Sequence, residues 1–213
     1  MTQTGRLSWK GLLILAIGVL VFPVFTGAAA RGAPQQPEQI SFTMVRSTAA
    51  QNGGCLGGAG ADVRVVTRGA NQVMQVNVRG LPANTGFVLF VIQVPNAPFG
   101  MGWYQGDVDT GANGRGSATF IGRFNIETFV VAPGSADAPR THRDQPFPDA
   151  GSNPATAPVH MYHLGLWFDV ANDARRAGCP ATVTPFNGDH TAGIQALSTR
   201  NFPPGNGPLR RLP

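Results

Sequence analysis

The side chains best suited to metal or acid–base chemistry in this sequence are four histidines, His142, His160, His163 and His190. His160 and His163 have the spacing that would place two ligands on one face of a helix. Their surroundings, VHMYHLGLWF, predict a strand instead, in which an odd offset puts the two side chains on opposite faces. Two alternatives remain open. His163 and His190 meet across neighbouring strands and hold a metal, or His163 is a partly buried, hydrogen-bonded structural residue.

A run of aromatic and glycine residues, Phe99-Gly-Met-Gly-Trp103-Tyr104, is suited to binding rather than to catalysis. Loops on a rigid β scaffold often carry binding residues, and exposed Trp and Tyr rings stack on sugars or anchor a protein partner. The same rings could instead fill the end of the fold as part of its core. Phe99, Trp103 and Tyr104 are therefore the candidate ligand-binding residues, with core packing as the alternative.

The sequence contains no recognisable motif for nucleophilic or phosphate chemistry. It has no Gly-x-Ser-x-Gly, and the glycine-rich run 53–60 lacks the Lys and Ser/Thr of a phosphate-binding loop. Asp107–Gly114 does not place oxygen ligands where an EF-hand needs them, and its Asp, Asn and Gly residues suit a tight hairpin turn. We therefore predict no catalytic residue and no cofactor, and we favour a binding or structural protein over an enzyme.

The N-terminal segment indicates export. Met1–Lys10 carries two basic residues and no acid, Gly11–Phe25 is an apolar run, and Thr26–Ala30 consists of small residues. This pattern predicts a signal peptide over 1–30 with cleavage after Ala30. The alternative is an uncleaved anchor, although the apolar run is shorter than the roughly 20 residues of a spanning helix. We expect a secreted, extracellular protein with no membrane span after signal cleavage.

The two cysteines of the chain, Cys55 and Cys179, support the same location. An exported chain meets an oxidising compartment, so the pair is predicted to form a disulfide. The alternative is two separate buried thiols.

The charge pattern argues against nucleic-acid binding. The chain has 16 basic and 11 acidic residues, and its adjacent basic pairs are Arg175–Arg176 and Arg210–Arg211. A nucleic-acid interface needs Lys and Arg clustered over one face. We therefore expect no nucleic-acid partner.

The elements that must position these residues are predicted to be strands. The chain has 28 Gly and 18 Pro, which disfavour helices, and short apolar or alternating runs are separated by turn residues. We predict an antiparallel β-sandwich, immunoglobulin-like or similar, with eight or nine strands. It spans 40–200, with a flexible lead-in over 31–39, a long loop over 132–158 and a Pro/Gly tail over 201–213. The candidate segments for these eight or nine strands are Ile40–Val45, Asp62–Arg68, Gln72–Arg79, Gly86–Val94, Gly102–Asp109, Arg115–Phe124, Asn125–Val131, Val159–Asp169, Ala181–Thr184 and His190–Thr199.

Several stretches resemble a family of uncharacterised secreted bacterial proteins. They are Gly80-Leu-Pro-Ala-Asn-Thr-Gly-Phe87, Phe90-Val-Ile-Gln-Val-Pro95, Trp103-Tyr-Gln-Gly-Asp107, Gly122-Arg-Phe-Asn-Ile-Glu127, His163-Leu-Gly-Leu-Trp-Phe168 and Thr184-Pro-Phe-Asn-Gly188. The first of them also resembles the strand-ending turn of immunoglobulin-like or fibronectin-like extracellular sandwiches. The resemblance implies export and a β-sandwich, and no established activity comes with it.

We therefore expect a secreted binding or structural module whose partner is an unknown extracellular ligand, a glycan or a protein. One alternative is a histidine-based metal-binding protein or enzyme built on His163 and His190. A second alternative is a carrier of a small apolar ligand.

Overall fold

A computed structural model describes residues 38–100, 102–127 and 159–213, which belong to one compact unit over 36–213. The predicted signal peptide, nearly all of the lead-in and the 132–158 loop lie outside the described residues. In the ranges that are described, no helix has the length and hydropathy needed to cross a membrane.

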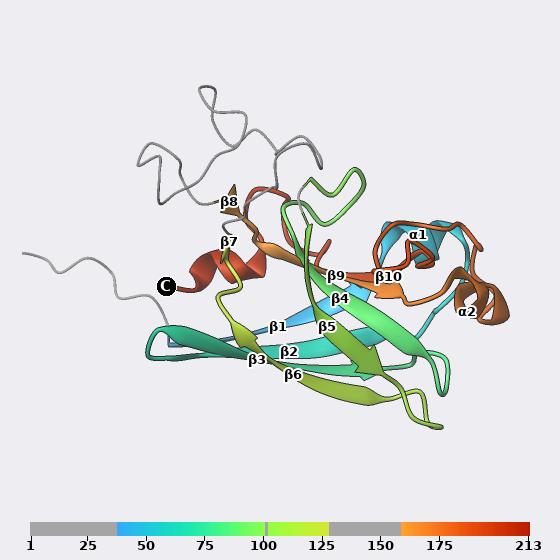
Figure 1. Ribbon diagram of the computed structural model, residues 1–213, viewed down its shortest axis with the longest axis horizontal. Coiled ribbons are helices and arrows are strands. Elements are labelled where there is room, and N and C mark those ends of the chain that lie inside the picture. Colours follow the sequence, from blue (N-terminus) through green and yellow to red (C-terminus); the bar gives the residue numbers. More distant parts are fainter. Residues whose placement is uncertain (1–37, 101, 128–158) are drawn as a thin grey trace, which may run out of the picture. The chain divides into compact units, whose positions relative to one another are not determined.

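Eight strands form one antiparallel sheet in the order β5-β4-β9-β10-β1-β2-β3-β6 (Figure 1). The first and last strands of this order, β5 and β6, are consecutive in the chain and lie close together, so the sheet curls nearly into a barrel. The predicted all-β antiparallel class is confirmed, and the curled sheet is compatible with a sandwich-like arrangement. The strands are β1 Gln39–Arg46, β2 Gly60–Arg68, β3 Asn71–Arg79, β4 Gly86–Ile92, β5 Gly102–Asp109, β6 Gly116–Gly122, β9 His163–Phe168 and β10 Gln195–Ser198.

Smaller elements surround the sheet. β7 (Ile126–Glu127) and β8 (Val159–His160) form a two-stranded ribbon. Helices α1 (Thr48–Asn52) and α2 (Ala171–Arg176) are short, and a 3-10 helix spans Pro208–Arg211.

Strands β4 and β9 are buried on both faces, as the continuous apolar run of β4 predicts. Phe87, Leu89 and Val91 of β4 belong to the main core inside the curled sheet. Val88 and Ile92 point to the other face, where they pack with Trp167 of β9 in a second, smaller cluster. We call these two sides the inner and the outer face. Because residues alternate along a strand, the outer face of β4 and β9 must be covered by other parts of the chain.

The predicted disulfide is present between Cys55 and Cys179, with an S–S distance of 2.03 Å. It joins the turn after α1 to the turn after α2, and both cysteines are buried. A disulfide is consistent with an oxidising compartment.

The C-terminal residues pack onto the core. Leu209 and Leu212 are buried, and the Leu209 N–H donates to the Tyr162 carbonyl over 3.1 Å. Gly207 passes so close that a Cβ there would lie 2.1 Å from the Tyr162 oxygen. This crossing coincides with the break between β8 and β9, so the single strand predicted over 159–169 is two strands. The strand predicted over 190–199 is also shorter than expected: β10 covers only 195–198.

Candidate functional site

A β-bulge in edge strand β5 creates a surface site. Tyr104 pairs with Phe90 and Gly106 pairs with Leu89, so Gln105 is an extra residue opposite β4. A spacing of three would normally put Tyr104 and Asp107 on opposite faces of a strand. The extra residue shifts the alternation by one, and both side chains lie on the outer face. The Tyr104 hydroxyl therefore donates a hydrogen bond to Asp107 Oδ1 over 2.8 Å.

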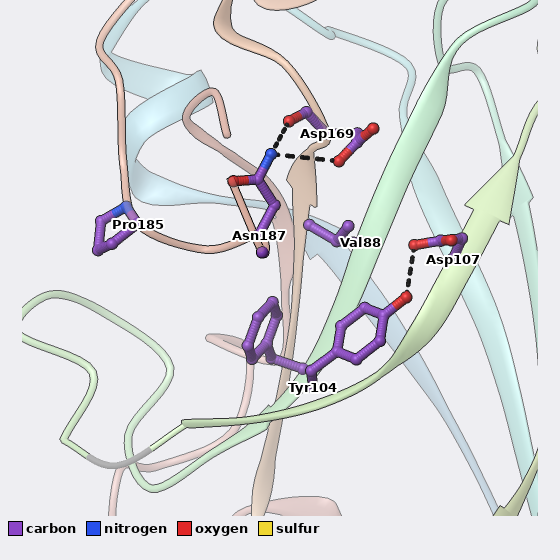
Figure 2. A pocket seen from close by; sticks show the side chains of 8 residues that line it. Val88, Tyr104, Asp107, Asp169, Pro185 and Asn187 are labelled. Carbon is purple, nitrogen blue, oxygen red and sulfur yellow. Dashed lines mark hydrogen bonds between the residues drawn. The ribbon is translucent and has the colours of Figure 1, made fainter. Parts of the chain in front are cut away.

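Tyr104 and Asp107 form one wall of a cavity of about 530 Å³, which we call the Tyr104 pocket (Figure 2). Its opposite wall comes from the end of β9 and from the loop that follows α2. Its lining residues are Val88, Phe90, Tyr104, Asp107, Asp169, Pro185, Asn187 and Gly188.

Asn187 fixes the far wall of the Tyr104 pocket. Its Nδ2 donates to the Asp169 carbonyl oxygen over 2.7 Å and to Thr191 Oγ1 over 3.0 Å. Its Oδ1 accepts from the Thr191 N–H over 2.8 Å. These bonds tie the loop to the end of β9 and hold the Asp169 carboxylate beside the cavity (Figure 2).

Phe90, which lines the pocket, belongs to a set of packed aromatic rings. Phe90 lies edge-to-face with Tyr104, Trp167 and Phe186, with ring centroids 5.2 to 5.7 Å apart. Trp167 stacks on Phe186 at 4.0 Å. Tyr104 is nevertheless 49% exposed, so its ring is supported from one side and open to a ligand from the other.

Among the described residues, the pocket carries negative charge without a counter-charge. Within the described part of the chain, neither Asp107 nor Asp169 forms an ion pair. Burial of the ring, the hydrogen bond to Asp107 and the charges of Asp107 and Asp169 raise the pKa of Tyr104 to about 12. The phenol therefore stays protonated at neutral pH and remains a donor to Asp107, which leaves the remaining carboxylate oxygens as acceptors.

The three aromatic residues proposed from the sequence do not form one surface. Phe99 is half-buried on the outer face, where it lies 5.2 Å from Trp167 and 5.3 Å from Phe186 between ring centroids. Trp103 pairs with Val91, an inner-face residue, so it points away from Tyr104 and lies 44% exposed at the rim of the sheet. Tyr104 alone of the three lines the pocket.

The two candidate metal ligands, His163 and His190, are not brought together. His163 opens β9 and is buried, with Nδ1 2.9 Å from Thr199 Oγ1 and Nε2 3.0 Å from the Pro204 carbonyl oxygen. His190 is exposed in the loop attached to the opposite end of β9. A strand rises about 3.3 Å per residue, so the length of β9 separates the two rings by roughly 15 Å. The described residues contain no group of three His, Cys, Asp or Glu side chains that could hold a metal ion.

Sequence reasoning missed Asp107, Asp169 and Asn187 as members of a binding site. The sequence places Asp107 at a predicted hairpin turn, and no local pattern connects it with Asp169 or Asn187. Comparison of the chain with protein-family models, curated proteins and solved structures finds no match. The functional argument therefore depends on the geometry of the site.

Proposed function

We propose that this protein is an exported binding module and that the Tyr104 pocket is its ligand site. One observation carries the proposal: an exposed tyrosine ring, fixed through its hydroxyl to Asp107, stands over a cavity of about 530 Å³. Ligand sites are typically concave, mostly apolar and equipped with a few polar groups that fix orientation. A purely structural role would not explain why the Tyr104 ring is fixed through its hydroxyl and yet left exposed at the cavity.

The chemistry of the pocket favours a glycan as the ligand. A sugar ring offers an apolar face for the Tyr104 ring and hydroxyl donors for the oxygens of Asp107 and Asp169. Both carboxylates lack ion pairs in the described structure and can accept such bonds.

The uncompensated charge supports a second candidate, a basic side chain of a protein partner. A lysine or arginine placed between Asp107 and Asp169 would gain both charge pairing and contact with the Tyr104 ring. The salt dependence of the binding affinity distinguishes the two candidates. Screening by salt weakens the binding of a cation much more than the binding of a neutral sugar.

The test is a calorimetric titration of the exported protein with a panel of neutral oligosaccharides and with lysine-rich peptides, at low and high salt. Tyr104→Ala should weaken binding about thirtyfold or more, as expected for a central aromatic anchor. Ile121→Ala is the matched control, since Ile121 is 72% exposed and is not among the residues that line the Tyr104 pocket. Unchanged affinity in Tyr104→Ala would remove this pocket as the ligand site.

Export is a separate part of the proposal. It is supported by the signal-like sequence of 1–30 and by the disulfide. We expect the mature chain to begin at or near Arg31. N-terminal sequencing that finds Met1 or Thr2 on most molecules would show that the segment is not cleaved and would favour a membrane-anchored protein over a secreted one.

A further inference from the structure

A second cavity lies on the outer face of β9 and β10, beside α1. It has a volume of about 420 Å³. We call it the Trp167 groove. Its apolar walls come from Ala49, Phe99, Pro180 and Ile194, and its floor is Trp167 and Gln195. The lining is completed by Asn52, Gly53, Thr182 and Thr184. None of the residues that line it carries a charge.

Two buried hydrogen-bond donors on this floor lack partners. Trp167 is fully buried and Gln195 is 3% exposed, and the two residues pair directly across β9 and β10. In the described structure neither Trp167 Nε1 nor Gln195 Nε2 has a hydrogen-bond partner. Buried donors are rarely left unpaired in native proteins, because such a group loses its bonds to water and gains none in return.

The indole cannot readily turn to find an acceptor within the protein. It stacks on Phe186 within 11° of parallel, and Phe99 contacts it edge-to-face. Its six-membered ring covers Gly165 so closely that a Cβ there would lie 2.3 Å from a ring carbon. The same Cβ would lie 2.6 Å from Gln195 Nε2. The glycine therefore makes room for the indole and the amide together, and the packing fixes both.

We infer that the Trp167 groove binds a small, neutral, mostly apolar molecule that carries a carbonyl oxygen. The apolar walls take the body of the molecule, and the carbonyl accepts hydrogen bonds from Trp167 Nε1 and Gln195 Nε2. A carboxylate fits poorly, because the groove has no cation to offset the cost of burying its charge. Both donor atoms are covered in the structure, so a side chain that lines the groove has to shift as the molecule enters. This site is distinct from the Tyr104 pocket, and the inference does not depend on the proposed function.

The experiment follows the indole N–H resonance of Trp167 in ¹H–¹⁵N NMR spectra of the exported protein, assigned with Trp103→Phe. The probes are cyclohexanone and methylenecyclohexane, which differ in shape very little and of which the ketone alone has an acceptor. In the free protein, we expect the indole N–H to exchange slowly with solvent and to resonate as an unbonded donor. Cyclohexanone should move it downfield and bind about tenfold more tightly than methylenecyclohexane.

Gln195→Leu is the second variant. It replaces an unpaired donor with an apolar side chain of similar size, so it should fold at least as stably and lose part of the preference for the ketone. Tyr104→Ala should bind cyclohexanone as the unmodified protein does. The inference is overturned if the indole N–H of the free protein exchanges rapidly with water. It is equally overturned if the two probes bind alike, or if neither probe perturbs the groove.

Discussion

Removal of the Cys55–Cys179 disulfide should cause a large loss of stability, and its size follows from the chain topology. The bond joins residues separated by 124 positions. In the chain-entropy description, a cross-link over such a loop stabilises the folded state by about 5 kcal/mol, because it restricts the unfolded chain. Cys55→Ala, Cys179→Ala and the double variant each break the same bond, so all three should lose a similar amount.

Thermal unfolding under non-reducing conditions measures this loss. For a domain of this size each kcal/mol shifts the melting temperature by about 2–4 °C, so the expected decrease is roughly 10–20 °C. The unmodified protein under reducing conditions is the control and should unfold near the temperature of the double variant. A double variant less stable than both singles by more than about 0.5 kcal/mol would refute the reasoning, because it would mean that the cysteines contribute separately.

Four further changes test other parts of the structure. Trp103→Ala should cost about 1 kcal/mol or less in thermal unfolding, since the ring is 44% exposed, whereas a loss of about 3–5 kcal/mol would identify a core residue. Leu209→Ala should lose about 2–5 kcal/mol in urea unfolding, and a loss under about 0.5 kcal/mol would mean that the C-terminal residues do not pack on the core. Gly165→Ala should weaken the near-UV circular dichroism of the Trp167–Phe186 stack, and an unchanged spectrum would contradict the close packing at position 165. Burial lowers the pKa of His163 below its ordinary 6.5, so the unfolded chain takes up the proton first. Urea midpoints should therefore fall as pH decreases below about 6.5 and fall less in His163→Gln; an equal slope in both proteins would assign the effect elsewhere.

The strands could be predicted from the sequence because their burial follows the simplest periodic rule. Val63 and Val65 of β2 and Val76 and Val78 of β3 alternate with polar residues, and all four point into the core. The apolar run of β4 likewise predicts burial on both faces. The break between β8 and β9 could not be predicted, because it coincides with the passage of Gly207, which is far away in the chain.

The candidate site was predictable only in part, for a related reason. Tyr104 stands out in the sequence as an aromatic residue near glycines, but the sequence gives no reason to prefer it to its neighbour Trp103. That choice depends on which face of β5 each side chain occupies. The bulge at Gln105 decides which residues join Tyr104, and it depends on pairing with β4 rather than on a local motif. Asp169 and Asn187 lie beside Tyr104 only because β9 pairs with β4 in the sheet, next to β5.

The location of both cavities follows from the way the outer face of β4 and β9 is covered. An apolar face this large has to be shielded from water, and the segment after α2 shields it with one ring, Phe186, stacked on Trp167. The residues of that segment that line the Trp167 groove are Pro180, Thr182 and Thr184, and those that line the Tyr104 pocket are Pro185, Asn187 and Gly188. The two cavities are therefore lined by adjacent parts of one covering segment. A continuous helix over the same face would have closed both, and the extended, proline-containing segment in its place leaves room for ligands beside the rings.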